Sequence, residues 1–211
     1  MEGDDIREMY QRSDKLHGVK YVNYISDGDS KIYKGVVTES PYGETIAIKK
    51  KECINYVQKW IGARLRTCKK GKPGIGGKLT AKLIDSLSNY YGLAIRRNTT
   101  STENMYKAIW TTVYHMSSTD DMPKHHYCPQ GADSWCTWQR ANAKGPLAQY
   151  KHKDALLQIV LDVITPIYED LSRKELLERC LGDFTQNNNE SFSSLVWRIA
   201  PKIMPGSAII V

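Results

Sequence analysis

The chain has 211 residues, of which 41% are hydrophobic and 25% are charged, so it is long and apolar enough to bury a core and is not an intrinsically disordered chain. It contains no apolar run of membrane-spanning length and no secretory signal in its acidic N-terminal residues, so we expect a soluble protein without a membrane partner. In such a protein the five cysteines indicate reduced thiols or metal ligands and not a disulfide framework.

The net charge of +7 is concentrated in one segment of the chain. Between Cys53 and Ile84 there is no Asp or Glu, and without the eight basic residues of that window the net charge would be −1. The eight are Lys59, Arg64, Arg66, Lys69, Lys70, Lys72, Lys78 and Lys82. A localised basic patch fits contact with the phosphate backbone of DNA, but a solvated loop explains the same pattern equally well.

The first part of the chain predicts a helix, a strand and an acidic turn. Residues 4–17 read as a short helix with Gly18 at its C-terminal cap, and the β-favouring run 19–25 stops at Asp27, which Gly28 follows. The C-terminal end of a buried strand is where α/β proteins present reactive groups, so Asp27 is a candidate metal-binding carboxylate. The simpler alternative is an ordinary cap, by Asp29 or Ser30, of the helix expected next.

Two short elements and one long helix are expected next. Residues 30–37 predict a helix that Pro41-Tyr42-Gly43 ends, and residues 45–49 alternate like a strand. From Cys53 the period changes, and Ile54, Val57, Ile61 and Leu65 mark one face of a helix. Residues 69–78 predict a flexible basic loop; Leu79 follows Gly77-Lys78 where a phosphate-binding P-loop needs Ser or Thr, so we reject that motif.

Four further helical segments follow the basic loop. The first carries an apolar stripe from Leu79 to Tyr91, and the second opens with the capping box Thr100-x-x-Glu103. The third spans residues 156–167, with Pro166 in its last turn, and the fourth opens with a second capping box, Ser172-x-x-Glu175. Helix therefore dominates the middle of the chain.

A loop rich in His, Cys and Trp, residues 123–140, interrupts these helices. His115, one of His125 or His126, Cys128 and Cys136 supply four ligands of the type that binds structural Zn²⁺. The spacing between the two cysteines matches no standard zinc motif, and the chain contains no Cys-x-x-Cys pair. The alternative is a loop held by Trp135 and Trp138, with buried neutral thiols and a surface His pair.

The last informative segment is the asparagine-rich stretch that leads to Glu190. An apolar helical face of Phe192, Leu195 and Val196 follows, which places Glu190 in the first turn of a helix. A carboxylate there complements the helix dipole. It could equally be aimed by the helix at a metal that Asp27 holds.

Taken together, several short pieces resemble the Mutator-like transposase domain of animal mobile elements over roughly residues 13–201. The pieces include residues 24–31, Lys51-Glu52-Cys53, residues 77–80, 90–96, 108–110, Cys128-Pro129, Asp133-Ser134-Trp135-Cys136, 166–168 and Thr185-Gln186-Asn187 with Asn189-Glu190-Ser191-Phe192. Their order and spacing are specific as a set, although no single piece is.

The resemblance implies a ribonuclease-H-like nuclease whose Asp-Asp-Glu triad binds two Mg²⁺ (or Mn²⁺) ions. It makes Asp27 the second acid and Glu190 the third, both catalytic and metal-binding. The fold class it implies is α/β and helix-rich, a partial ribonuclease-H-like core with a large α-helical insertion. We expect residues 1–52 in the partial core, 53–182 in the insertion with the basic loop 66–82, and 183–211 in the core helix and C-terminal tail. DNA is the expected partner, the nucleus the expected location, and a homo-oligomer is possible.

The sequence also departs from the family pattern. Only 26 residues precede Asp27, too few for the strands and helix expected before the second acid, so we expect the first Asp of the triad to be missing. Tyr56 stands where a Cys-x-x-His signature starting at Cys53 would place His, and Ser193 stands where Asn is usual. We therefore expect an incomplete transposase, inactive as these 211 residues. The alternatives are a non-catalytic DNA-binding module that uses residues 59–82 and a relic that does not fold stably.

Overall fold

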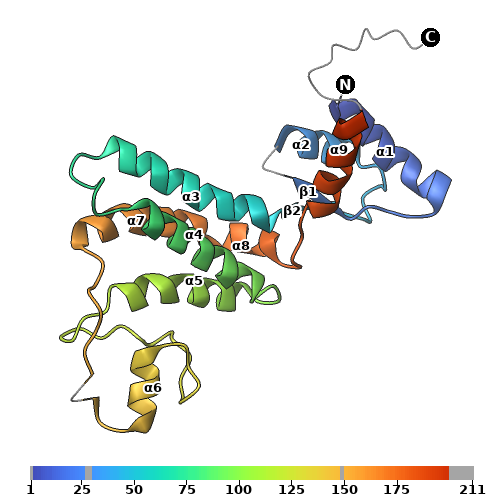
Figure 1. Cartoon of the computed structure of the whole chain (residues 1–211). Helices are drawn as coiled ribbons and strands as arrows, with labels where there is room; N and C mark the ends of the chain where they lie inside the picture. The colour runs from blue at the N-terminus through green and yellow to red at the C-terminus, as the bar shows by residue number, and fades with distance from the viewer. Residues whose placement is uncertain (1, 27–29, 148–149, 200–211) are drawn as a thin grey trace. The chain divides into compact units, whose positions relative to one another are not determined.

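A computed structural model of the chain describes residues 2–26, 30–147 and 150–199 (Figure 1). These ranges contain nine helices and two strands, in the order α1 (Glu2–His17), β1 (Asn23–Ser26), α2 (Ser30–Glu39), β2 (Lys49–Glu52), α3 (Ile54–Gly71), α4 (Ala81–Arg96), α5 (Thr102–Met116), α6 (Thr137–Lys144), α7 (Gln158–Leu171), α8 (Lys174–Cys180) and α9 (Asn187–Ile199). The chain divides into two compact units, which we call the strand unit (Met1–Cys53 with Phe184–Val211) and the helical unit (Ile54–Asp183).

The strand unit is built on a parallel pair of strands. β1 pairs with β2 in a register that runs from Asn23 opposite Lys49 to Ser26 opposite Glu52. Parallel neighbours need a crossover connection, and α2 supplies it. A small core lies around this βαβ unit and consists of Tyr10, Tyr24, Val36, Tyr42 and Ile48.

Both strands are displaced from the segments that the sequence predicts. The expected strands at residues 19–25 and 45–49 become Asn23–Ser26 and Lys49–Glu52, because only these residues find a pairing partner. The backbone N–H of Tyr21 donates instead to the Tyr42 hydroxyl, at 2.9 Å. The alternation at 45–49 reflects Ile48, which belongs to the small core, and Ile46, which packs against it; both precede the strand. The predicted helices at 4–17 and 30–37 are confirmed, and Gly18 ends α1 with φ +62°.

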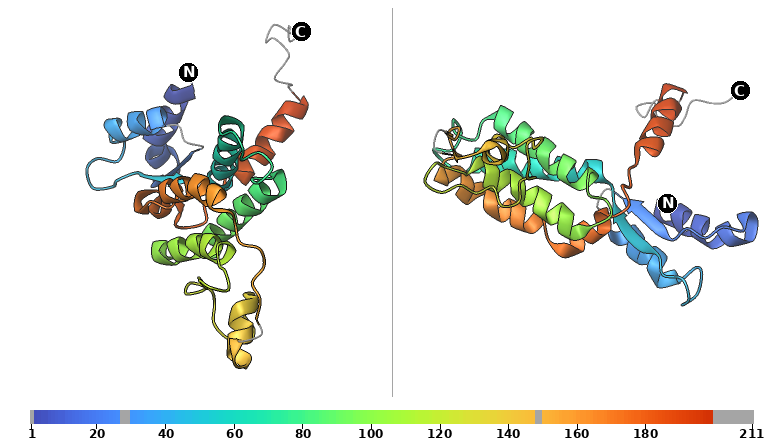
Figure 2. Two further views of the ribbon diagram at one scale, coloured as in Figure 1. Left: turned by 90° about the vertical axis from the view of Figure 1, so that its left-hand side faces the viewer. Right: turned by 90° about the horizontal axis from the view of Figure 1, so that it is seen from below.

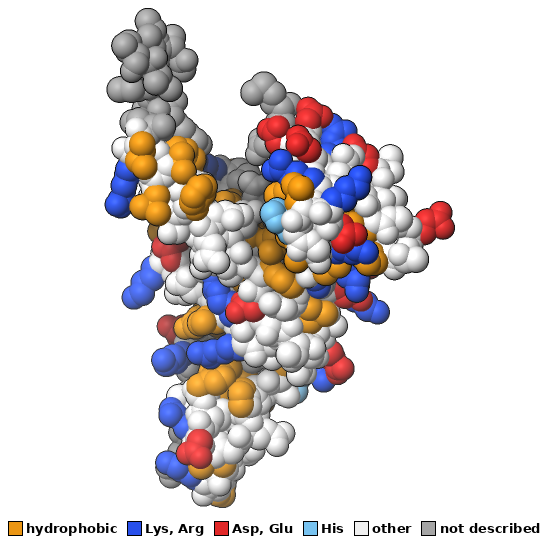
Figure 3. Space-filling model, turned by 90° about the vertical axis from the view of Figure 1, so that its right-hand side faces the viewer, with side chains coloured by type: hydrophobic (Ala, Val, Ile, Leu, Met, Phe, Trp, Pro, Cys, Tyr) orange, Lys and Arg blue, Asp and Glu red, His pale blue; other side chains and the backbone are white. Residues whose placement is uncertain are grey.

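Helix α9 belongs to the strand unit but buries no side chain. The side-chain amide of Gln186, just before α9, donates to the main-chain oxygen of Ile25 in β1, at 3.0 Å. The helix nevertheless leaves its large apolar side chains exposed, and hydrophobic side chains gather on its surface in Figure 3. They are Phe192, Leu195, Val196, Trp197 and Ile199.

The helical unit packs α3, α4, α5, α7 and α8 around one core (Figures 1 and 2). Ile54, Val57, Ile61 and Leu65 of α3 are fully buried, as their spacing predicts. Gly92 lets α4 approach α3 closely, because a Cβ at that position would lie 2.3 Å from the Gln58 side-chain oxygen. The hydroxyl of Tyr91 donates to the main-chain oxygen of Leu171, at 2.8 Å, and so ties α4 to the end of α7.

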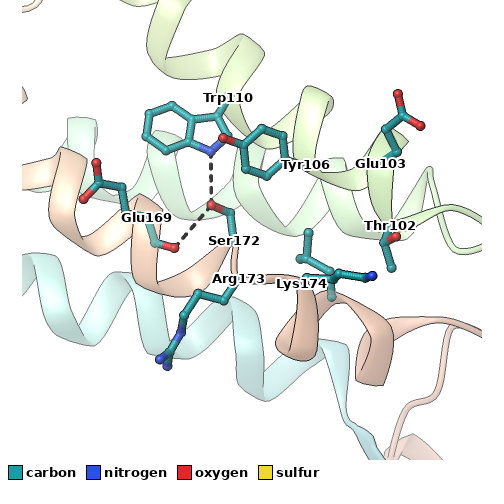
Figure 4. Close-up of a pocket in the computed structure, with 9 residues that line it drawn as sticks. Thr102, Glu103, Tyr106, Trp110, Glu169, Ser172, Arg173 and Lys174 are labelled. Carbon is teal, nitrogen blue, oxygen red and sulfur yellow. Dashed lines mark hydrogen bonds between the residues drawn. The ribbon is translucent and has the colours of Figure 1, made fainter.

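Three local predictions in the helical unit are wrong by small margins. Ser101, and not Thr100, caps α5, since its hydroxyl accepts the backbone N–H of Asn104. Ser172 does not cap α8: its hydroxyl accepts the indole N–H of the buried Trp110 (3.1 Å) and donates to the Glu169 carbonyl (Figure 4). A buried indole N–H needs an acceptor. The Ser172 hydroxyl provides it and therefore does not cap α8. Helix α3 also continues to Gly71, so the basic loop begins only at residue 72.

The expected class of a helix-rich α/β protein is confirmed for the described residues. A ribonuclease-H-like core is not established by one parallel pair of strands, and it stays a prediction. None of the described helices is both long and apolar enough to cross a membrane.

Candidate metal centre

Four side chains that the sequence marks as possible zinc ligands meet in the helical unit. His115 comes from the last turn of α5, His125 and Cys128 from the following loop, and Cys136 from the N-cap of α6. Their ligand atoms all lie within 4.8 Å of one another, and three of the four residues are buried while His115 is half-buried. The described residues thus contain a compact set of two imidazoles and two thiols.

The distances between these atoms match a tetrahedral zinc site. Each thiol sulfur lies 3.5–3.6 Å from the Nδ1 atoms of both His115 and His125. Structural zinc binds sulfur at about 2.3 Å and imidazole nitrogen at about 2.0–2.1 Å in tetrahedral geometry, which corresponds to a sulfur–nitrogen edge of about 3.6 Å. The four side chains therefore fit a zinc ion without rearrangement.

Short-range hydrogen bonds shape the loop that carries the ligands. The N–H of Cys128 donates to the His125 carbonyl (3.0 Å), which also accepts the side-chain amide of Gln139 in α6 (2.9 Å). The N–H of Cys136 donates to the hydroxyl of Ser134, at 3.1 Å. Each bond fixes the backbone at or beside a ligand and so helps to position the four side chains.

The two tryptophans of the loop pack on the ligand histidines. The Trp138 ring stacks on His125 with 4.8 Å between ring centres, and the Trp135 ring meets His115 edge-on at 5.0 Å. The tryptophan-held loop and the metal site, which the sequence presents as alternatives, are thus combined in one arrangement. The structure also decides between the two neighbouring histidines, because His126 is exposed and packs on Tyr114 and Tyr127, away from the thiols.

A second layer of polar groups orients His125. Its Nε2 lies 2.9 Å from the hydroxyl of Ser118 and 3.0 Å from Nε2 of His152, whose Nδ1 lies 2.8 Å from Asp120. If His125 turns the lone pair of Nδ1 to the metal, its proton resides on Nε2 and can be donated to His152, which in turn donates from Nδ1 to Asp120. Sequence reasoning missed His152 and Asp120, since nothing in their spacing links them to the ligands.

Burial shifts the pKa values of three of the ligands, His115, His125 and Cys128, toward their neutral forms. It lowers the pKa of His125 to about 4, with further contributions from His115 and His152, and it lowers the pKa of His115 as well. Burial, with the neighbouring Cys136, raises the pKa of the Cys128 thiol to about 12. The imidazole lone pairs are therefore available at neutral pH, whereas ligation by Cys128 has to displace a proton.

The two predicted catalytic carboxylates belong to the strand unit. Asp27 lies outside the described residues, directly after β1. Glu190 is exposed in the first turn of α9, and its N–H donates to the carbonyl of Gln186, the residue whose side chain is bonded to Ile25. The described residues thus bring the start of α9 to β1. They include only Glu190 of the two predicted ligands of Mg²⁺.

One further carboxylate, that of Glu52, lies at the end of β2; in the sequence it is noted only as part of the segment Lys51-Glu52-Cys53. Glu52 ends β2, is 2% exposed and pairs in register with Ser26, the residue before Asp27. One of its oxygens lies 3.9 Å from the ammonium group of Lys50. Its place at the carboxyl end of the parallel pair could have been inferred from the sequence only if the register of the strands were known.

The eight basic residues between Cys53 and Ile84 fall into two groups. Arg64 is paired with Asp170, and Arg66 with Asp85, while the ammonium group of Lys59 lies over the ring of Tyr56. The second group forms no ion pair with any described residue and lies on the last turn of α3, the loop after it and the first turn of α4. It consists of Lys69, Lys70, Lys72, Lys78 and Lys82, and we call it the lysine cluster.

Comparison with known proteins gives one family. A family model described as Mutator-like transposase matches residues 1–136, a span that includes Asp27, the lysine cluster and all four candidate metal ligands, but not Glu190. No curated protein and no solved structure matches the chain.

Proposed function

The chain belongs to the Mutator-like transposase family, and from that premise we propose that its helical unit binds DNA in transposition while these 211 residues do not cut DNA by themselves. The observation that carries the proposal is the lysine cluster, five cations on adjoining segments with no ion pair among the described residues. Lysines that form no internal pair can neutralise phosphates and release their counterions.

The candidate metal centre would stabilise the DNA-binding helical unit without itself contacting DNA. We propose that His115, His125, Cys128 and Cys136 hold a structural Zn²⁺. With four protein ligands a tetrahedral zinc ion keeps no open position for a substrate, so it would supply stability and not catalysis. Because α5 contributes His115 and Cys136 is the N-cap of α6, such an ion would fix the intervening loop to the helices.

The catalytic part of the proposal concerns Asp27 and Glu190, which by family resemblance are two of three acids. The described residues before Asp27 form α1 and β1, and β1 itself contains no acid that could complete the set. A site that lacks a metal-binding carboxylate loses most of its rate enhancement. A non-catalytic DNA-binding module is the second candidate, because the helical unit has a core of its own. In either case DNA is the partner and the nucleus the expected location.

Salt-dependent binding tests the DNA proposal. The zinc-loaded chain should bind unrelated DNA duplexes with similar affinity, and the affinity should fall steeply with salt. Reversal of Lys69, Lys70 and Lys72 to Glu should weaken binding of all duplexes alike and reduce the salt slope by about one for each phosphate contact that is lost. Reversal of three exposed lysines elsewhere, Lys34, Lys144 and Lys153, is the charge-matched control. Undetectable binding at low salt, or an equal effect of the control, contradicts the proposal.

A cleavage assay tests the catalytic part. Purified chain with Mg²⁺ or Mn²⁺ should leave labelled DNA intact. Strand cleavage that Asp27→Ala or Glu190→Ala abolishes would show that these residues form a working site and that the proposal is wrong.

A further inference from the structure

Beside the metal centre the helical unit has a groove that the lysine cluster does not line. The groove lies between α4 and α5, has a volume of about 910 Å³ and is bordered on one side by residues of the metal-centre loop. This volume is within the usual range of small-molecule pockets. We call it the α4–α5 groove.

The chemistry of its lining is aromatic and basic. Trp135 and Tyr90 contribute large rings that are 54% and 49% exposed, and Tyr127 contributes a third. Arg97 and Lys107 contribute cations, and Asn104 contributes an exposed amide. None of the described residues that line the groove is acidic.

The two cations of the groove differ in whether they form an ion pair with a described acidic residue. Arg97 forms no ion pair with a described residue. The ammonium group of Lys107 lies 2.5 Å from the carboxylate of Glu103, one helical turn earlier in α5 and outside the groove lining. Arg97 is therefore the better candidate for contact with an anion.

The metal centre holds the most exposed ring of the groove in place. Trp135 lies between Ser134, whose hydroxyl accepts the N–H of Cys136, and the ligand Cys136 itself. Its ring also packs edge-on against the ligand His115. An indole that is half exposed yet anchored on both sides loses little conformational entropy when a flat partner stacks on it.

We propose that the α4–α5 groove receives an unpaired nucleobase of DNA, which stacks on Trp135 while Arg97 contacts the adjoining phosphate. Exposed aromatic rings combined with cations are the recognition elements of single-stranded nucleic acid, and an exposed amide can bond to a base edge. A paired base cannot reach the groove because its faces are covered in the duplex stack. The inference rests on the proposed DNA-binding function and adds a second contact, selective for unpaired DNA, to the non-selective lysine cluster.

The test compares a blunt duplex with the same duplex carrying a short single-stranded extension. The zinc-loaded full chain should bind the extended duplex more tightly. Trp135→Ala should weaken that binding by about fivefold to 150-fold, the value expected for one stacked base, and leave the blunt duplex unaffected. Trp135→Phe should retain most of the preference because it keeps a ring. The matched control is Trp197→Ala, which removes another exposed tryptophan, from α9, and should retain the preference fully.

Each outcome of the test decides one point. Zinc stoichiometry and far-ultraviolet circular dichroism establish that Trp135→Ala keeps the metal centre and the helices; if it does not, the Trp135→Phe variant and Arg97→Ala carry the comparison. If both DNAs bind equally well, or if the preference survives both Trp135→Ala and Arg97→Ala, the inference is wrong and the DNA-binding function stands. If neither DNA binds at low salt, the DNA-binding function itself fails and the inference fails with it.

Discussion

The two units of this chain bury their side chains to very different degrees. Among the described residues, the core of the helical unit contains 24 buried hydrophobic side chains and that of the strand unit contains five. The helical unit also carries the candidate metal centre, whereas α9 of the strand unit leaves all its apolar side chains exposed. The residues that resemblance assigns to catalysis belong to the less buried unit, and those that we propose for binding belong to the better packed one. Substitutions in one unit can therefore affect the proposed DNA binding or the predicted catalytic residues without affecting the other.

Loss of the metal should have the largest effect and would test whether the helical unit depends on its core alone. Zinc binding contributes apparent free energies of about 10–16 kcal/mol in small zinc-dependent folds, so Cys136→Ser should abolish stoichiometric zinc and hydrogen-exchange protection in the loop before α6. Protection in α3 and α4 should persist because their core does not include the ligands. The matched control is Cys68→Ser, in α3. A loop that stays protected without zinc would mean that its tryptophans suffice.

Paired truncations compare the two cores directly. Ile61→Ala in the helical unit and Ile48→Ala in the strand unit remove the same atoms, and such changes cost about 2–5 kcal/mol. Ile61 is fully buried and Ile48 is 7% exposed in a core of five residues, so we expect the larger loss for Ile61→Ala. Denaturant unfolding followed by segment-resolved hydrogen exchange measures both losses. Equal losses would remove the distinction between the cores.

Removal of the outer hydrogen bonds should have an intermediate effect and would show how the helical unit orients its ligands. Substitution of an outer-shell partner of a metal-bound histidine typically lowers the metal affinity by about 10-fold to 100-fold. His152→Gln should therefore lower zinc affinity by that factor, measured by competition with a chromophoric chelator, and Asp120→Asn by less. His126→Gln alters an exposed neighbour and should change nothing. Unaltered affinity in His152→Gln would refute the orienting role.

The smallest expected effect concerns alkaline pH and the strand unit. Burial, with neighbouring tyrosines, raises the pKa of Tyr10 to about 12 from its ordinary value of 10. The folded state holds this proton more tightly than the unfolded state, so the resulting stability is complete below pH 10 and is lost as the pH rises from about 10 to about 12. Tyr10→Phe should remove this part of the loss, and the exposed Tyr106→Phe should not. Melting temperatures of the three proteins across that range measure the difference.

Sequence reasoning succeeded where structure depends on local periodicity. The stripe from Ile54 to Leu65 predicted a buried helix face because the helical repeat is a property of neighbouring residues. The strands were displaced because pairing is decided by a partner elsewhere in the chain. At α5, two adjacent hydroxyl residues could each have been the cap, and Ser101 rather than Thr100 took that position.

The metal centre shows the same limit. The types of its residues predicted which side chains could gather there, yet the choice of His125 over His126 depended on how the loop folds back on α5. His152 is 27 residues from His125 and 32 from Asp120, so no local pattern could have connected the three. Whether Asp27 and Glu190 share a metal remains a prediction that the cleavage experiment addresses.

The hydrogen bond from Gln186 to Ile25 has a consequence for the order of folding. It joins residues 161 positions apart, and the strand unit is thus assembled from the two ends of the chain with the helical unit between them. Closing so long a loop has an entropic cost, which is smaller once the intervening residues are already compact. The helical unit is contiguous in the sequence and can form from neighbouring segments, whereas the strand unit needs residues from both sides of it to meet. We therefore expect pulse-labelled hydrogen exchange during refolding to show protection in α3 and α4 before protection in β1.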